Sequence, residues 1–275
     1  MRLHALSGIG EITPQSDLAA LIRQSLRQDG LTLQVDDVLV VAQKIISKNE
    51  GRLYRLSDVH PSQAALSLAA QVRKDPRFVE LVLQESCEVV RAVPDILITR
   101  HKQGYVMANA GIDRSNLAPM ASLASSPDLQ SPDPESPDPD DQVLLLPVDC
   151  DASAARLRQS LAPEHPAVVI SDSFGRPWRE GVVNVALGVA GMAALRDQRG
   201  ERDRHGRVMQ TTQVAVADAI ASAAGLLMGE GDEGRPIVLL RDLPRSWRVS
   251  SATTRARELE SGQALIRARE QDLFR

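Results

Sequence analysis

The segment 171–179 concentrates side chains that could do chemistry. It offers the carboxylate of Asp172, the hydroxyl of Ser173, two arginines and one of the chain's two tryptophans. A carboxylate beside a hydroxyl supplies two oxygen ligands for a hard cation such as Mg²⁺ or Mn²⁺. The guanidinium groups of Arg176 and Arg179 have the planar fork that binds phosphate or carboxylate. An ordinary strand-to-loop turn with surface arginines is the alternative interpretation.

A second cluster of the same kind occupies residues 109–116 and shifts the balance toward a functional site. Gly111 suits a turn that brings the backbone close to a ligand. Asp113 is the natural cation ligand, and the side chain of Asn116 can both donate and accept hydrogen bonds. Because a cation needs oxygen atoms from several segments, Glu230 is a candidate to complete a site begun by Asp113 and Asp172.

Two further segments have the features of phosphate-binding sites. Gly8 and Gly10 would let backbone amides approach a phosphate closely, although a tight turn alone also explains them. Lys44 and Lys48 follow a strand-like run and could neutralise a polyphosphate, with a solvated strand end as the alternative.

The hydrophobic pattern predicts the elements that must position these groups. Short apolar runs rich in β-branched residues indicate buried strands at 38–42, 143–147, 167–170, 184–192 and 237–240. Helical periodicity predicts helices at 18–27, 152–161 and 214–228, and a mostly exposed helix over 253–274. Ser16-Asp17 is expected to open and cap the first of these, and helical patterning over 61–85 is broken at Asp75-Pro76. The order strand, helix, strand across 143–170 suggests a crossover unit, with Asp151 as the helix cap. The cluster at 171–179 is then expected in the loop after a core strand.

The bulk composition is that of an ordinary globular chain. Its 275 residues fit one large domain or two modest ones, 43% are hydrophobic and the formal net charge is −4. The 3% aromatic content and the lack of a long basic stripe argue against nucleic-acid binding. We expect no membrane segment, because no apolar run reaches 18 residues. Cys87 and Cys150 lack metal-type spacing and fit a reduced, cytoplasmic protein.

Residues 118–141 differ from the rest because they form an acidic, proline-rich run of low complexity. Such a run cannot bury enough apolar surface to offset its ordering entropy, so it predicts a flexible acidic insertion.

Taken in order, five of these motifs carry a family resemblance. They are 41–52 (VAQKIISKNEGR), 109–116 (NAGIDRSN), 145–154 (LLPVDCDASA), 171–179 (SDSFGRPWR) and 228–230 (MGE). In this order the chain resembles the coenzyme F420-0:L-glutamate ligase family, also called F420:γ-glutamyl ligase. The resemblance covers nearly the whole chain except the acidic insertion.

The resemblance implies an α+β fold particular to the family, in which mixed sheets pack with helices and two chains form an intertwined homodimer. It implies one stand-alone ligase module over 1–275, possibly built from two intertwined α+β subdomains. The activity implied is GTP-dependent addition of L-glutamate to F420-0, followed by further γ-linked glutamates. The cofactors implied are two divalent ions, Mg²⁺ or Mn²⁺, together with K⁺.

The resemblance also assigns residues. Family metal ligands fall on Asp113, Asp172, Ser173 and Glu230. Family GTP-binding positions fall on Ile9, Gly10, Glu11, Ile12, Gln43, Lys44, Lys48 and Asn116. Further GTP-binding positions fall on Met228, Gly229 and Gly231, in a loop that runs from Met228 to Arg235. We expect Asp113 and Asp172 to be catalytic, and charge complementarity adds Arg176, with Arg179, as a grip on the acidic substrate.

Four positions depart from the family pattern. Ser173 stands where threonine is usual and keeps the hydroxyl, whereas Glu230 replaces the usual glutamine and adds a negative charge. Gly10 replaces a proline, and Val148-Asp149-Cys150 replaces Glu-Asp-Pro. These departures bear on the acceptor and on the number of glutamates more than on the reaction type.

The expected mechanism follows from the fact that a carboxylate does not react with an amine at neutral pH, because its leaving group is poor. Transfer of the GTP γ-phosphoryl group would make an acyl phosphate that the glutamate amine can attack, and this transfer needs positioning and charge neutralisation. Two alternatives stay open: a nucleotide- and metal-binding regulator without turnover, and a related amide ligase with another acidic acceptor.

Overall fold

The computed structural model describes residues 1–117, 141–244, 247 and 259–272. The expected acidic insertion therefore lies outside the described residues, apart from Asp141. The chain divides into two compact units. Unit 1 comprises residues 1–11, 16–46 and 148–275, and unit 2 comprises residues 12–15 and 47–147. Both contain helices and sheets, so the expected α+β class is confirmed.

Unit 1 is built on a five-stranded sheet of order β1-β12-β2-β8-β9. Its strands are β1 (Arg2–Ala5), β2 (Val38–Ala42), β8 (Ala167–Arg176), β9 (Arg179–Ala190) and β12 (Ile237–Arg241). The central pair, β2 and β8, is parallel, and every other pair is antiparallel. The four residues Val38–Val41 are buried, as expected of a strand covered on both faces.

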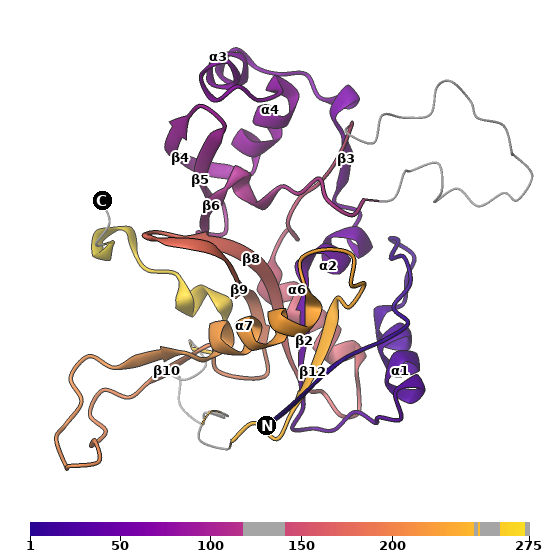
Figure 1. Cartoon of the computed structure of the whole chain (residues 1–275), viewed down its shortest axis with the longest axis vertical. Coiled ribbons are helices and arrows are strands. Elements are labelled where there is room, and N and C mark those ends of the chain that lie inside the picture. The colour runs from indigo at the N-terminus through magenta and orange to yellow at the C-terminus, as the bar shows by residue number, and fades with distance from the viewer. Residues whose placement is uncertain (118–140, 245–246, 248–258, 273–275) are drawn as a thin grey trace, which may run out of the picture. The chain divides into compact units, whose positions relative to one another are not determined.

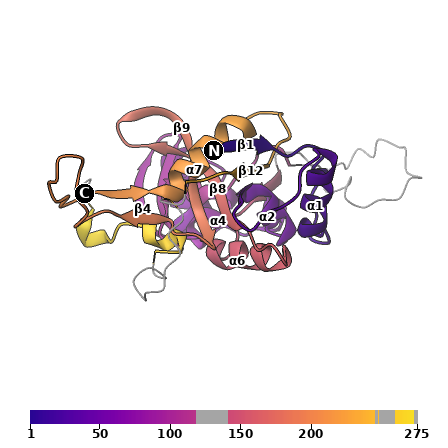
Figure 2. The same cartoon turned by 90° about the horizontal axis from the view of Figure 1, so that it is seen from below.

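Helices cover the two faces of this sheet (Figure 2). On one face lies α7 (Val216–Met228), whose small and apolar side chains pack on Val40, Val169 and Val238. On the other face lies α6 (Cys150–Ser160), which approaches β9 so closely that a Cβ at Gly188 would lie 2.1 Å from the Cys150 carbonyl oxygen. The helix α1 (Leu18–Gln28) begins at the predicted Asp17 cap and contacts α6.

A two-stranded arm completes unit 1. It consists of β10 (Leu195–Asp197) and β11 (Gln213–Ala215), which leads directly into α7 (Figure 1). The described residues after β12 contain short 3₁₀ turns at Gly262–Leu265 and Arg269–Gln271. The expected helix over 253–274 is therefore wrong for residues 259–272, and 253–258 and 273–275 lie outside the described residues.

Unit 2 packs helices on small sheets. Its helices are α3 (Gln63–Val72) and α4 (Pro76–Gln84), and its sheets are β3 (Leu53–Arg55) with β7 (Gln142–Leu144), and β4 (Ser86–Val93) with β5 (Ile96–His101) and β6 (Val106–Ala108). The break expected at Asp75-Pro76 is confirmed, because Asp75 caps α4 and Pro76 takes its first position. A core centred on Val79, Leu97 and Val143 joins these elements. The helix α2 (Gln43–Asn49) follows β2.

Three local predictions are corrected. β8 continues through Ser171–Arg176 and pairs with β9, so the chemical cluster lies on a long hairpin and not in a loop. The crossover prediction is wrong, because β7 and β8 belong to different sheets. Asp149 caps α6, whereas Asp151 accepts hydrogen bonds from the Val189 and Gly262 amides and from the Ser261 hydroxyl. No helix in the described part of the chain is long and apolar enough to cross a membrane.

Candidate active site

One edge of the unit 1 sheet gathers most of the predicted site segments. β2 and β8 are parallel with Ala42 opposite Ser171, so Gln43 and Asp172 follow at the same edge. β12 runs antiparallel to β2 and starts at this edge, and the Pro236 carbonyl accepts a 2.8 Å hydrogen bond from the Ala42 amide. β1 ends there too, because the Leu6 amide donates to the Ile237 carbonyl at 2.9 Å. Segments 8–11, 43–44, 171–173 and 229–236 therefore leave the sheet at a common edge.

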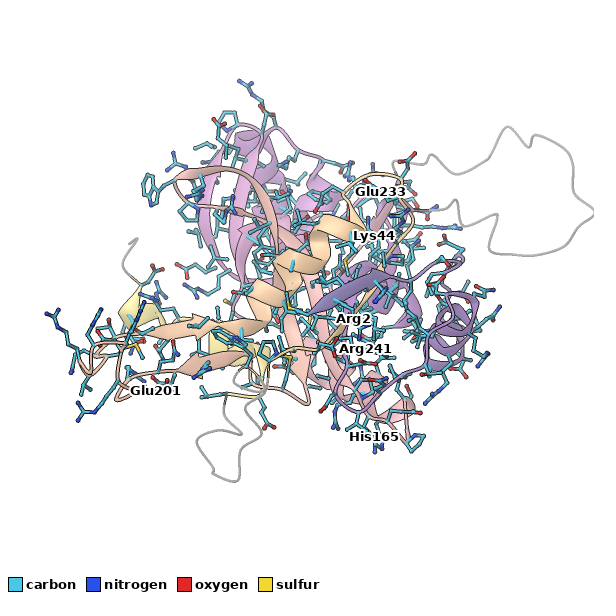
Figure 3. All side chains as sticks on the ribbon, turned by 60° about the horizontal axis from the view of Figure 1, so that its bottom comes forward. Arg2, Lys44, His165, Glu201, Glu233 and Arg241 are labelled. Carbon is cyan, nitrogen blue, oxygen red and sulfur yellow. The ribbon has the colours of Figure 1, made fainter. Side chains whose placement is uncertain are left out.

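Four of the side chains labelled in Figure 3 mark the two ends of these strands. Lys44 and Glu233 lie toward the edge just described, whereas Arg2 and Arg241, which are paired in the β1–β12 register, lie at the other. Gln43 is buried and Lys44 is partly buried, since α2 begins directly after the strand. Lys48 stands one turn further along the same helix.

The glycine-rich loop after α7 is organised by a carboxylate that the sequence interpretation missed. Gly229 ends the helix with φ of +73°, and the Gly231 amide donates a 2.9 Å hydrogen bond to Glu233. A Cβ at Gly229 would lie 2.1 Å from the Glu233 carboxyl carbon, so this position needs glycine for space and for conformation. Met228 is buried and Glu230 is exposed. The sequence could have indicated Glu233 only through the concentration of acidic residues in this loop.

Strand alternation separates two predicted cation ligands. Ala167 and Val169 belong to the core cluster under α7, so the same alternation turns Ser171 and Ser173 toward α7 and Asp172 toward the opposite face. The extra residue of the irregularity near this point lies in β9, which leaves the alternation of β8 intact. The Ser171 hydroxyl is buried and has no hydrogen-bond partner in the structure.

Arg176 lies at the far end of the β8–β9 hairpin. Its Nη2 atom donates to the Glu180 carbonyl at 3.1 Å, and its buried Nε atom has no hydrogen-bond partner among the residues that the structure describes. It is four residue steps from Asp172 along β8, about 13 Å at 3.3 Å per residue. Trp178 at the tip is 86% exposed and has φ of +62°. The structure thus places Arg176 well away from Asp172 along the hairpin.

A partly buried carboxylate that the sequence interpretation passed over lies against β9 of this hairpin. Asp218, in the first turn of α7, accepts a 2.9 Å hydrogen bond from the Ala186 amide on β9. Burial raises the pKa of Asp218 above its ordinary value, and the bond from Ala186 offsets only part of this effect. It therefore fixes α7 against β9 directly beside Ser171, which pairs with Ala186.

Unit 2 holds the remaining predicted residues. Asp113 forms a two-way backbone bridge with Leu144, with N···O distances of 2.9 and 2.8 Å. Its Oδ1 atom accepts hydrogen bonds from the Ser115 amide and hydroxyl at 2.7 and 2.9 Å. The Lys48 ammonium donates to the Asn116 carbonyl at 3.3 Å, which joins two predicted nucleotide-binding positions. Ile12 is buried in this unit.

The turn before Asp113 is strained. Asn109, Ala110 and Gly111 all have positive φ values, of 52°, 54° and 71°, and the first two are not glycine. The buried Oδ1 atom of Asn109 has no hydrogen-bond partner in the structure. Such conformations persist where surrounding packing enforces them and are common at functional sites, which supports a functional role for this turn.

Each unit therefore brings together its own part of the predicted site. Asp172, Ser173, Gln43, Lys44 and the loops at 9–11 and 228–231 belong to unit 1, and Asp113, Asn116, Lys48 and Ile12 belong to unit 2. Among the described residues there is no group of three or more His, Cys, Asp and Glu side chains that could hold a metal ion. The four-ligand cation site stays a prediction.

Comparison with known proteins identifies the family. The family model described as F420-0:Gamma-glutamyl ligase matches residues 8–242. The chain belongs to this family. The match of this F420-0:γ-glutamyl ligase family member spans every predicted site residue, from Ile9 to Gly231.

Relatives of this family member align over nearly its full length. It is 38% identical to the coenzyme F420:L-glutamate ligase of Methanothermobacter thermautotrophicus over 99% of this chain and 98% of that protein. It is 40% identical to the protein of the same name from Methanopyrus kandleri, over 96% and 94% of the two chains. With that from Halorubrum lacusprofundi it shares 42% identity over 88% and 87%.

Proposed function

We propose that this chain is a GTP-dependent ligase that adds L-glutamate to coenzyme F420-0 and then adds further γ-linked glutamates. The carrying observation is that segments 8–11, 43–44, 171–173 and 229–236 leave the unit 1 sheet at one edge. The relatives named coenzyme F420:L-glutamate ligase support the acceptor and the amino acid.

The proposed reaction proceeds through an acyl phosphate. A carboxylate oxygen of the acceptor attacks the γ-phosphorus of GTP, and the bond to the β-phosphate oxygen breaks to release GDP. The glutamate amine then attacks the activated carbonyl carbon, loses a proton and displaces inorganic phosphate. Because the phosphoryl step depends on positioning and charge neutralisation, rigid strand ends with adjacent cationic side chains suit it.

The protein's own groups divide the work. Gln43, Lys44 and the loops at 9–11 and 228–231 hold the nucleotide, with backbone amides of the glycine-bearing segment 8–11 as donors to phosphate oxygens. Lys48 and Asn116, which are in contact within unit 2, are the nucleotide-binding positions proposed for that unit. Arg176 grips the acidic substrate at a distance from the phosphates, as its place on the hairpin requires.

A cation pair fits the donor set. Asp113, Asp172, Ser173 and Glu230 present oxygen atoms only, which suits Mg²⁺ or Mn²⁺ and not soft metals. When bound, such ions neutralise charge on the transferring phosphoryl group, and K⁺ is a proposed additional activator. Since Asp172 and Ser173 project to opposite faces of the strand, we expect Asp172 to be the stronger determinant of cation binding.

We propose a cytoplasmic homodimer. Its support is a set of exposed apolar side chains: Val89, Val90, Ile96 and Val106 of unit 2, and Trp178 and Val182 on the β8–β9 hairpin. Light scattering on the purified protein should give twice the 29.8 kDa chain mass. A monomer at micromolar concentration would remove this part of the proposal.

The test of the activity is to incubate the protein with F420-0, L-glutamate, GTP and Mg²⁺. Mass spectrometry should detect an acceptor heavier by one or more glutamyl residues, and GDP should appear only when both F420-0 and glutamate are present. GTP binding without any GDP release would favour the nucleotide-binding regulator. GDP release with an acidic acceptor other than F420-0 would favour the related amide ligase.

A further inference from the structure

Arg52, which follows α2 in unit 2, contacts other protein groups through all three nitrogen atoms of its guanidinium group. Its Nε atom donates to the Leu146 carbonyl at 2.9 Å, and its Nη2 atom donates to Glu85 at 2.5 Å. Its Nη1 atom lies 3.3 Å from the Tyr54 hydroxyl. The Arg52 side chain is only 14% exposed, so it is placed to hold protein segments together and not to contact substrate.

The partner carboxylate is itself embedded in a polar group of side chains. Glu85 lies 3.7 Å from His101 Nε2 and 3.9 Å from the Lys102 ammonium. The His101 ring is fixed from its other side, because Nδ1 accepts a 3.0 Å hydrogen bond from the Gln103 amide. Burial would raise the pKa of Glu85, but His101, Arg52 and Lys102 outweigh it and hold that pKa below its ordinary value. Glu85 is therefore an ionised anchor for Arg52 at neutral pH.

The segment that Arg52 holds is continuous with the residue that pairs with Asp113. The Leu145 amide donates to the Arg52 carbonyl at 3.0 Å, so Arg52 grips residues 145–146 through both its backbone and its side chain. The preceding residue, Leu144, forms both backbone hydrogen bonds of the bridge to Asp113. The Gln103 side chain adds a 2.7 Å bond to the Pro147 carbonyl.

Apolar packing reinforces the polar clamp that Arg52, Glu85 and Gln103 form around residues 145–147. A Cβ on Gly111 would lie 2.9 Å from Leu146, so the strained turn before Asp113 lies directly on the same segment. Leu144 and Leu146 are at most 1% exposed, which leaves little room for the segment to shift. A displacement of residues 144–146 would therefore pass to Asp113 through two backbone hydrogen bonds and one close contact.

We propose that Arg52, anchored by Glu85, is a positioning residue that fixes the Asp113 carboxylate for cation binding. This inference rests on the proposed role of Asp113 as a cation ligand. Groups that orient a metal ligand from behind typically change metal affinity by about 10–100-fold when mutated. Neither Arg52 nor Glu85 needs to touch the cation, the nucleotide or the acceptor for this effect.

The test is the variant Arg52→Lys, which keeps the charge but cannot hold the Leu146 carbonyl and Glu85 with one planar fork. Mn²⁺ binding in the presence of GTP is followed by electron paramagnetic resonance on wild type, Arg52→Lys and Asp113→Asn. We expect the Mn²⁺ dissociation constant of Arg52→Lys to rise about tenfold. The Mn²⁺ concentration for half-maximal ligation should rise in parallel.

Arg241→Lys is the matched control. Arg241, whose side chain is about as buried as that of Arg52, makes a two-bond ion pair with Asp37 in unit 1, at the sheet edge away from the site. It should lose thermal stability as Arg52→Lys does, yet keep wild-type Mn²⁺ affinity. If Arg52→Lys does not fold, Gln103→Ala removes the neighbouring clamp on Pro147 and should still weaken Mn²⁺ binding about threefold, below the lower end of the usual range.

The outcomes separate the two ideas. Weak Mn²⁺ binding in Asp113→Asn with wild-type binding in Arg52→Lys would overturn the positioning role alone. Wild-type binding in Asp113→Asn would overturn the assignment of Asp113 and, with it, the role of Arg52. Equal losses of affinity in Arg52→Lys and Arg241→Lys would reduce the effect to general destabilisation and would also overturn the inference.

Discussion

The two units support their site residues in different physical ways. In unit 1, Gln43 and Asp172 continue strands whose apolar side chains are buried on both faces by helices. In unit 2, Asp113 follows a strained turn, and the segment opposite it is fixed by hydrogen bonds from Arg52 and Gln103. Apolar packing is insensitive to pH, whereas a polar clamp depends on the ionisation of its members. The site residues of the two units are therefore expected to respond differently to mutation and to pH.

The sharpest test of the unit 1 edge is Asp172→Asn. Loss of a pre-organised charge at a phosphoryl-transfer site typically lowers kcat about 100-fold or more. Ser173→Ala should cost less, about tenfold or below, because its side chain turns to the other face of β8. Steady-state ligation rates decide the order, with Asp242→Asn at the opposite sheet edge as the control. A larger loss in Ser173→Ala would contradict the assignment.

Packing beneath the unit 1 edge is tested by Gly188→Ala. The new Cβ would lie 2.1 Å from the Cys150 carbonyl oxygen, so α6 must move away from β9. Overpacking of this kind costs about 3 kcal/mol of unfolding free energy, at the upper end of its usual range. Gly10→Ala has no atom within 4 Å of its new Cβ and should stay within about 0.5 kcal/mol. Urea denaturation compares the two, and equal stability would refute the close approach.

The polar support of unit 2 is tested by Glu85→Gln. Removal of this charge leaves Arg52 partly buried without a counterion, at a cost of about 2 kcal/mol at pH 7. The pKa of Glu85 is lowered by folding, so its stabilisation is present above its ordinary value of 4.5 and is lost as pH falls below it. The stability gap between variant and wild type should therefore narrow on acidification. A gap independent of pH would argue against an ionised anchor.

Asp218→Asn should change stability least, and it should stabilise the protein where Glu85→Gln destabilises it. Folding raises the pKa of Asp218, so the wild-type carboxyl contributes most stability below its ordinary value of 3.8 and loses it as pH rises. Asparagine can still accept the Ala186 hydrogen bond. The variant should gain stability relative to wild type between pH 4 and 7 in thermal melts. A relative loss over that range would show that the carboxylate is stabilised in its ionised form.

Local patterns predicted the elements well where capping chemistry and burial agreed. Ser16-Asp17 was recognisable as a helix start, Asp75-Pro76 as a helix break, and the apolar run at 38–42 as a core strand. The prediction failed where long-range pairing overrides local polarity. Residues 171–176 are polar and glycine-bearing, yet they continue β8 because β9 supplies a hydrogen-bonding partner. Asp151 was mistaken for a cap because its partners, Val189 and Gly262, are distant in sequence.

The site was predictable only in part for the same reason. The motifs identified the carboxylates and lysines, because carboxylates bind cations and lysines bind phosphates wherever the fold places them. They could not identify Arg52, Glu85 or Gln103, whose role comes from which carbonyls they reach. The sequence shows that Glu233 and Asp218 are acidic but not what they bind. Only the fold reveals that Glu233 organises the loop after α7 and that Asp218 joins α7 to β9.

The parallel pairing of β2 with β8 has a consequence for how the chain folds. The two strands are adjacent in the sheet, yet residues 47–147, which form most of unit 2, lie between them in sequence. Their union closes a long loop, and the entropy lost on closure must be met before the contacts can stabilise anything. Prior folding of the inserted segment shortens that loop. During synthesis, the sheet that carries Asp172 is thus among the last parts of the molecule to form.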